Sequence, residues 1–224
     1  TGGALAEAFK QFGKLNLDDE DPVVCMSGDI WFNFFLRPIV DAHKKIQSER
    51  DEYITTVVFY EIPEDESYRF GVVGKEGLEN LGNGIYRVRT FIEKPARGSE
   101  EWEKKFVSGK KSLINAGITI YSYGMWKEIE EIDRSYGDKK WREADVLLTK
   151  LADEGRLFGY NTGVQRDIIH EFDNSNLYWA DLGTIGAYEK ELRNWGINII
   201  PLYRVIERGP PLYRKYALST GLIW

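Results

Sequence analysis

An aspartate follows shortly after a short, unbroken apolar stretch of the chain. Residues Val23–Met26 run without a polar break, and Ser27-Gly28 then leads to Asp29. Unbroken apolar runs are typical of strands buried on both faces. A carboxylate at the carboxyl end of such a strand lies where open α/β sheets bind ligands, so Asp29 is a candidate for holding a divalent cation or a polar ligand. The alternative is that Asp29 caps a helix formed by Ile30–Asn33.

A second carboxylate, Asp181, has the same two interpretations. It lies within Trp179–Thr184, immediately before a helical pattern. Either Asp181 or Thr184 can cap that helix. Alternatively, Asp181 supplies the second carboxylate on a cation held by Asp29.

The composition limits which cation this could be. The chain has one cysteine, Cys25, which lies in the apolar run and is expected to belong to the core. Its two histidines, His43 and His170, are far apart in sequence and match no zinc-ligand spacing. A metal in this chain would therefore be a hard cation held by carboxylates, and Mg²⁺ is expected.

Two further segments place polar residues where a sheet is usually apolar. Phe91–Pro95 ends a strand with Glu93 and Lys94. This pair is either an ordinary surface ion pair or a site in which the glutamate binds sugar hydroxyls and the lysine contacts a phosphate. Leu113–Tyr121 contains Asn115-Ala116-Gly117, and asparagine and glycine are depleted in strands. The glycine indicates either a plain bulge or a close approach of a ligand to the backbone.

The elements that must position these residues alternate between strand and helix. Apolar spacing and turn residues predict strands at 23–26, 54–62, 70–73, 85–93, 113–121, 157–160 and 166–172. They predict helices at 3–12, 34–50, 99–106, 125–132, 141–154 and 184–195, the last ended by Gly196, and a glycine-rich turn at 74–84. Such alternation predicts an α/β domain with a mixed, mostly parallel central sheet flanked by helices.

Composition and charge exclude several function classes. The 224 residues carry a net charge of −6, which argues against a non-specific grip on nucleic acid. No apolar run is long enough to span a bilayer and no secretory signal is visible, so we expect no membrane association and a cytoplasmic location. The remaining classes are enzymes and binding proteins that act on small molecules.

Taken in order, the motifs resemble those of the sugar-1-phosphate nucleotidyltransferases, the NDP-sugar pyrophosphorylases. The matching segments are Thr1-Gly2-Gly3-Ala4-Leu5, Ser27-Gly28-Asp29, Phe70–Val73, Phe91–Pro95, Asn115-Ala116-Gly117 and Trp179–Thr184. The resemblance covers roughly residues 1–195, which we expect to form the catalytic domain, with 196–224 as a C-terminal extension. It implies a Rossmann-like fold and attack by a sugar 1-phosphate on the α-phosphorus of a nucleoside triphosphate.

The resemblance also implies roles for particular residues. Asp29 and Asp181 would hold Mg²⁺, and Lys94 would contact the sugar phosphate. The nucleotide would lie against Gly2, Gly3 and Gly28. The sugar pocket would be lined by Gly71, Glu93, Asn115 and Gly117. A homo-oligomer is expected, since family members are often oligomers.

One departure from the family pattern qualifies these expectations. The family's glycine-rich triphosphate loop, with its arginine and lysine, has no counterpart in these residues. We therefore expect the 224 residues to be part of a longer protein, and to transfer nucleotides inefficiently on their own. Two alternatives stay open: a non-catalytic nucleotide-sugar-binding regulatory homologue, and a glycosyltransferase, for which Asp19-Glu20-Asp21 matches an Asp-x-Asp motif only by letters.

Overall fold

The computed structural model of the chain describes residues 2–12, 17–137, 139–173 and 176–194. The chain divides into two compact units, residues 1–179 and 180–224. The expected boundary between 195 and 196 lies outside the described residues. Among the described helices, none is long and apolar enough to cross a membrane.

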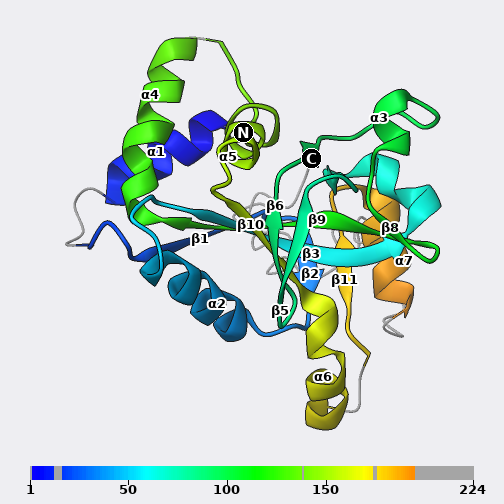
Figure 1. Ribbon diagram of the computed structural model, residues 1–224. Helices are drawn as coiled ribbons and strands as arrows, with labels where there is room; N and C mark the ends of the chain where they lie inside the picture. The colour runs from blue at the N-terminus through cyan, green and yellow to red at the C-terminus, as the bar shows by residue number, and fades with distance from the viewer. Residues whose placement is uncertain (1, 13–16, 138, 174–175, 195–224) are drawn as a thin grey trace, which may run out of the picture. The chain divides into compact units, whose positions relative to one another are not determined.

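Nine strands of the first unit form one sheet (Figure 1). Its spatial order is β5 (Leu78–Gly82), β6 (Ile85–Val88), β10 (Leu157–Asn161), β3 (Thr55–Pro63), β9 (Lys111–Ser122), β4 (Val72–Val73) and β7 (Phe91–Ile92). The long strand β9 also pairs with β1 (Pro22–Met26) and with β8 (Val107–Ser108). Two short strands, β2 (Ile30–Phe32) and β11 (Trp179–Asp181), lie outside this sheet.

The predicted mixed α/β class is confirmed, while the balance of strand directions differs from the prediction. Among the described pairs of the sheet, β3 and β10 run parallel and the others run antiparallel. The reason is that β5 and β6 form a hairpin with a short turn, and that the connection from β4 to β7 contains this hairpin and no crossover helix, so both pairs are antiparallel neighbours.

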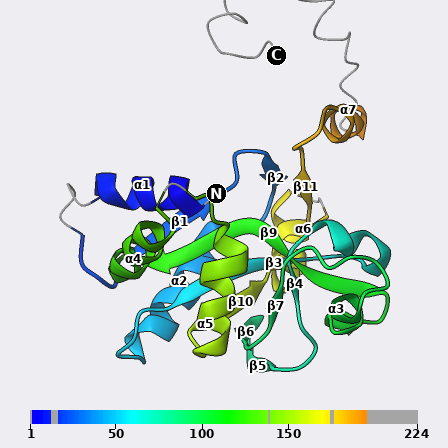
Figure 2. The ribbon, with the colours of Figure 1, turned by 90° about the horizontal axis from the view of Figure 1, so that it is seen from above.

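Helices cover both faces of the sheet (Figures 1 and 2). One face packs against α1 (Gly2–Phe12), α4 (Trp126–Tyr136), α5 (Thr149–Asp153) and a π-helical turn, η3 (Ala144–Leu148). The other packs against α2 (Leu36–Ser48) and α6 (Arg166–Asp173). The remaining helical segments are α3 (Glu100–Glu103), α7 (Ile185–Asn194) in the second unit, and the 3₁₀ turns η1 (Glu64–Arg69), η2 (Tyr123–Met125) and η4 (Thr162–Gln165).

Most predicted helices and strands are present near their expected bounds, but three predictions are wrong. The segment 166–172 forms α6 rather than a strand: Gln165 and Ile169, four residues apart, are buried while the three residues between them are exposed, a helical rather than a sheet pattern. The expected turn at 74–84 contains the strand β5, whose exposed residues gave no apolar signal. The C-terminal extension expected at 196–224 lies outside the described residues.

The third correction concerns β1, which is not buried on both faces. Val23 is buried, but Val24 is 36% exposed and Met26 is 54% exposed. In the described chain β1 pairs with β9 on one side only, so it is an edge strand of the sheet. The unbroken apolar run of β1 therefore does not reflect burial on both faces, which such runs usually indicate.

Candidate functional site

A tight corner at the end of β7 holds Glu93 and Lys94. Lys94 has a φ of 45°, in the left-handed region that non-glycine residues rarely adopt. Its backbone amide donates to the carbonyl of Phe70 at 3.2 Å, and its Nζ lies 3.8 Å from Oε1 of Glu93. Burial raises the pKa of Glu93, and the positive charge of Lys94 opposes that rise. The corner thus presents a half-buried carboxyl beside an exposed ammonium group.

Gly71 makes room for this corner. A Cβ at position 71 would lie 2.5 Å from Cζ of Phe91 and 2.7 Å from Oε2 of Glu93, so the corner packs directly on the glycine backbone. The carbonyl of Gly71 accepts a 2.8 Å hydrogen bond from the amide of Asn115. Gly71 therefore joins the Glu93 corner to β9.

The Asn115–Gly117 segment lies in the middle of β9, which runs through it as one continuous strand. Oδ1 of Asn115 accepts from the amide of Gly117 at 2.8 Å. Gly117 has a φ of 75°, and a Cβ there would meet Oγ of Ser27 at 3.0 Å. The irregularity appears as a register shift between Val57 and Phe59 of the facing strand β3. The segment thus combines a backbone irregularity with a close approach to Gly117, and the residue that approaches the glycine is Ser27.

The contact between Ser27 and Gly117 connects β9 to the segment that ends at Asp29. The amide of Ser27 donates to the carbonyl of Gly117 at 2.8 Å. Gly28 and Asp29 then form an exposed turn, with nothing within 4 Å of a Cβ built at Gly28. The next residues form β2, so the interpretation of Asp29 as the cap of a helix at 30–33 is wrong. In the part of the chain that the structure describes, no hydrogen bond or ion pair occupies its carboxylate.

Four segments that are distant in sequence therefore meet in the first unit. Backbone hydrogen bonds and close contacts connect, in order, the Ser27–Asp29 turn, Gly117 and Asn115, Gly71, and the Glu93–Lys94 corner. Seven of the ten residues singled out from the sequence lie on this path: Gly28, Asp29, Gly71, Glu93, Lys94, Asn115 and Gly117.

The glycines at the start of α1 lie elsewhere. Gly2 is buried under the indole of Trp141: a Cβ would meet its ring at 2.2 Å, and the amide of Gly2 donates to the carbonyl of Trp141 at 3.1 Å. Gly3 is exposed, with Oδ1 of Asp133 at 3.8 Å from a Cβ built there. Packing on Trp141 by itself accounts for the glycine at position 2.

Asp181 belongs to the second unit. Its Oδ1 accepts from the amide of Gly183 at 2.8 Å, and Oγ1 of Thr184 accepts from the amide of Ala187 at 3.2 Å. Thr184 therefore caps the start of α7, one of the two predicted capping arrangements. Asp181 stabilises the turn before the helix, and its Oδ2 has no partner in the described part of the chain.

Sequence reasoning missed one contact beside Asn115. The indole of Trp179 donates to the carbonyl of Ala116 at 2.8 Å, and its ring packs 5.7 Å from Tyr60 and 5.4 Å from Phe70 between centroids. The sequence interpretation of the Trp179–Thr184 motif gave Trp179 no role. The one signal was a tryptophan two residues before the candidate ligand Asp181, and sequence spacing alone does not connect it to β9.

The donor atoms at the turn suit a hard cation. Asp29 offers an exposed carboxylate with no protein partner among the described residues. Oxygen-only donors are those that Mg²⁺ prefers. Within the described residues, no three of the His, Cys, Asp or Glu side chains gather closely enough to hold a metal by themselves.

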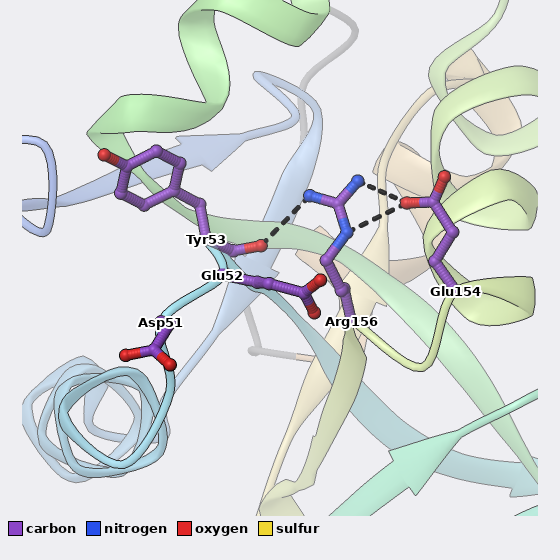
Figure 3. A pocket seen from close by; sticks show the side chains of 5 residues that line it. All are labelled: Asp51, Glu52, Tyr53, Glu154 and Arg156. Carbon is purple, nitrogen blue, oxygen red and sulfur yellow. Dashed lines mark hydrogen bonds and ion pairs between the residues drawn. The ribbon is translucent and has the colours of Figure 1, made fainter.

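A separate hollow of about 610 Å³ lies at the amino ends of the two parallel strands, β3 and β10 (Figure 3). It is lined by Asp51, Glu52, Tyr53, Glu154 and Arg156, which precede β3 and β10. Arg156 donates to the carbonyl of Tyr53 at 3.2 Å and to Glu154 at 2.8 Å, so its guanidinium is already engaged. None of the residues predicted from the sequence lines this hollow.

Comparisons with known proteins agree on one family. A family described as nucleotidyl transferase matches residues 1–195. The glucose-1-phosphate adenylyltransferase of Thermus thermophilus is 25% identical over 169 residues, covering 74% of this chain and 36% of that protein. The one of Bacillus mycoides is 24% identical over 237 aligned positions, covering 99% and 52%. The chain thus spans about half, or less, of the length of these relatives.

Solved structures support the fold. The apo form of a UDP-glucose pyrophosphorylase superposes with a TM-score of 0.56 at 16% identity, covering 87% of this chain and 59% of that one. A complex of UDP-glucose pyrophosphorylase with UDP-glucose gives a TM-score of 0.55 at the same identity. At such low identity the likeness concerns the fold alone.

Proposed function

The chain belongs to the nucleotidyl transferase family, and from this membership we propose that the protein joins a sugar 1-phosphate to a nucleotide. A phosphate oxygen of the sugar 1-phosphate attacks the α-phosphorus of a nucleoside triphosphate. The bond from that phosphorus to the bridging oxygen of the β-phosphate breaks, and pyrophosphate leaves. The products are an NDP-sugar and pyrophosphate.

The observation that carries this proposal is the convergence of four motifs in the first unit. Asn115 is hydrogen-bonded both to Gly117 and to Gly71, Gly117 bonds to Ser27 before Asp29, and Gly71 packs against Glu93. Close packing accounts for Gly71 and Gly117, but it does not require a half-buried carboxyl and an amide at the same point of the sheet. A polyhydroxylated ligand does, because its hydroxyls need fixed acceptors and donors close to the backbone.

Glu93 and Lys94 have complementary tasks in the proposal. Glu93 accepts hydrogen bonds from sugar hydroxyls, and Lys94 contacts the sugar phosphate. Transfer at phosphorus needs in-line positioning and charge neutralisation more than a side-chain nucleophile, because the sugar phosphate is itself the nucleophile. An ordered carboxyl next to an exposed ammonium group suits both tasks.

We propose that Asp29 and Asp181 hold Mg²⁺, which when bound neutralises charge on the transferred phosphate. Among the described residues, the carboxylate of Asp29 and Oδ2 of Asp181 have no hydrogen-bond or ion-pair partner, which supports this assignment. On the nucleotide side, the open turn at Gly28 supports close approach of a ligand, and Gly2 and Gly3 stay proposed contacts of the base. A cytoplasmic location and a homo-oligomer are proposed from the family alone.

The test is a substrate screen with the intact protein. Each nucleoside triphosphate, with Mg²⁺, is combined with a panel of hexose 1-phosphates, and release of pyrophosphate is measured. We expect one combination to give turnover and the corresponding NDP-sugar by mass spectrometry. Binding of a nucleotide sugar without any turnover would favour the non-catalytic regulatory alternative instead.

A further inference from the structure

A π-helical turn packs directly behind the Glu93 corner. This turn, η3, places Leu147 and Leu148 in the same buried cluster as Phe91 of β7, with Ala144 and Val146 partly buried against it. Single π-helical turns are rare and frequently occur at functional sites. Here the turn fixes the charged residues at its start next to β7.

A buried hydrogen bond fixes the first of these charges. The hydroxyl of Tyr121, fully buried in β9, donates to Oε1 of Glu143. Burial and the neighbouring carboxylate raise the pKa of Tyr121 well above its usual value, so the phenol stays a donor. Glu143 is therefore an acceptor held at a defined position beside the sheet.

The other two charges of the turn form an exposed pair. Arg142 is ion-paired with Asp145, and their side chains are 64% and 36% exposed. Exposed pairs of this kind contribute little to stability, typically about 0–1 kcal/mol. Stability alone therefore gives little reason for the pair to lie where it does.

All three charges act on Glu93. After burial, which raises its pKa most, the pKa of Glu93 is lowered by Lys94, raised by Asp145, lowered by Arg142 and raised by Glu143. If Lys94 binds the phosphate, the charged groups left near the sugar are the carboxylates of Glu93, Glu143 and Asp145 and the guanidinium of Arg142. That end of the proposed pocket is thus negative overall.

We propose that the turn at Arg142–Asp145 sets sugar selectivity, admitting neutral and amino sugar 1-phosphates and rejecting those with a sugar carboxylate. This rests on the proposed function and names the substrate class of the same site. A sugar carboxylate would meet like charge from Glu93, Glu143 and Asp145, and repulsion of this kind is an efficient way to exclude a wrong ligand. A protonated amino group would meet attraction at the same point.

The direct test compares ligands that differ in one charge. Binding of glucose 1-phosphate, glucosamine 1-phosphate and glucuronic acid 1-phosphate, and of the three galactose counterparts, is measured by calorimetry on the intact protein with Mg²⁺. Between charges several ångströms apart in a protein environment, one added like charge corresponds to about tenfold or more in affinity. We expect the uronic acid phosphates to bind at least about tenfold more weakly than the neutral ones.

Near-isosteric variants then change the charge of the turn in opposite directions. Asp145→Asn makes it less negative and should bring glucuronic acid 1-phosphate closer to glucose 1-phosphate. Arg142→Gln makes the turn more negative and should increase the difference in affinity between glucose 1-phosphate and glucuronic acid 1-phosphate. Glu143→Gln keeps an oxygen for the hydroxyl of Tyr121 and should act like Asp145→Asn. The matched control is Arg37→Gln, which breaks an equivalent exposed Arg–Asp pair on α2.

The outcomes separate this inference from the function on which it rests. If neutral and acidic sugar phosphates bind equally, or if Asp145→Asn and Arg142→Gln leave the ratio unchanged, the selectivity inference fails while the proposed function stands. If the folded wild-type protein binds no sugar 1-phosphate at all, the proposed function fails and takes the inference with it.

Discussion

The backbone amide of Asn115 donates a 2.8 Å hydrogen bond to the carbonyl oxygen of Gly71. This bond joins the middle of β9 to the residue that leads into β4, and through Gly71 it reaches the Glu93 corner. Two motifs far apart in sequence thereby become one surface. The bond is a backbone interaction, so it survives most side-chain changes and lets the side chains around it be tested one at a time.

Gly71→Ala tests whether the corner needs its close packing. The new Cβ would meet Oε2 of Glu93 at 2.7 Å and the ring of Phe91 at 2.5 Å, so the corner must move. We expect a loss of about 1–3 kcal/mol in the free energy of unfolding, typical of overpacking, and a marked loss of affinity for sugar 1-phosphate. Chemical denaturation and calorimetric binding measure the two effects.

The control for that substitution is Gly186→Ala. Gly186 lies in α7 with nothing within 4 Å of a built Cβ, so alanine should be neutral or stabilising by up to about 1 kcal/mol. Unchanged stability and affinity in Gly71→Ala would contradict the packing of Glu93 against this glycine.

Asp29→Asn tests the proposed metal ligand. Its carboxylate has no protein partner among the described residues, so the free energy of unfolding should change little. We expect weaker binding of Mn²⁺, used as a spectroscopic probe for Mg²⁺, in electron paramagnetic resonance titrations. Turnover should fall by at least about a hundredfold, as expected when a charge that stabilises the transition state is lost.

Asp181→Asn should have the same effect on Mn²⁺, while the turn to Gly183 persists because the amide oxygen can still accept. Asp153→Asn, at the exposed end of α5, is the matched control and should bind Mn²⁺ as the wild type does. Full turnover in both Asp29→Asn and Asp181→Asn would leave the two carboxylates with structural roles only.

His43 predicts a loss of stability in mild acid. It is fully buried between Oγ1 of Thr56 and Oγ of Ser122, at 2.9 and 3.2 Å, and burial lowers its pKa to about 4. Between pH 6.5 and 4 the unfolded chain binds a proton at this histidine and the folded chain does not. The stability that neutral His43 provides is complete above pH 6.5 and is lost as the pH falls toward 4.

The size of that effect is on the order of 3 kcal/mol, from the difference between the folded and unfolded pKa values. Denaturation curves at several pH values would measure it, with His43→Gln to remove the titrating group. The difference between wild type and variant should depend on pH only in that interval. Parallel pH profiles for the two proteins would show that His43 is not the group responsible.

Much of the fold and most of the candidate site follow from local patterns. The spacing of Leu5 and Phe9 predicts α1, and the polar residues Asn115 and Glu93 mark their strands because they interrupt apolar runs. The failures depend on tertiary neighbours. The exposure of Met26 reflects which strands flank β1, and the role of Glu143 reflects a hydroxyl on a distant strand. No local pattern encodes either relationship.

Lys94→Gly should raise the free energy of unfolding and lower the affinity for sugar 1-phosphate. Lys94 has a φ of 45°, and a left-handed conformation costs a residue with a Cβ roughly 1–2 kcal/mol relative to its usual ones. Glycine removes that strain, so we expect the free energy of unfolding to rise by about 1 kcal/mol after the entropic cost of glycine is counted. The affinity for sugar 1-phosphate should fall, because the ammonium group proposed to contact the phosphate is lost. The matched control is Asn83→Gly, at a φ of 51° in the turn between β5 and β6, which should gain stability without losing affinity. If Lys94→Gly binds as well as the wild type, the strained lysine is kept for a reason other than phosphate binding.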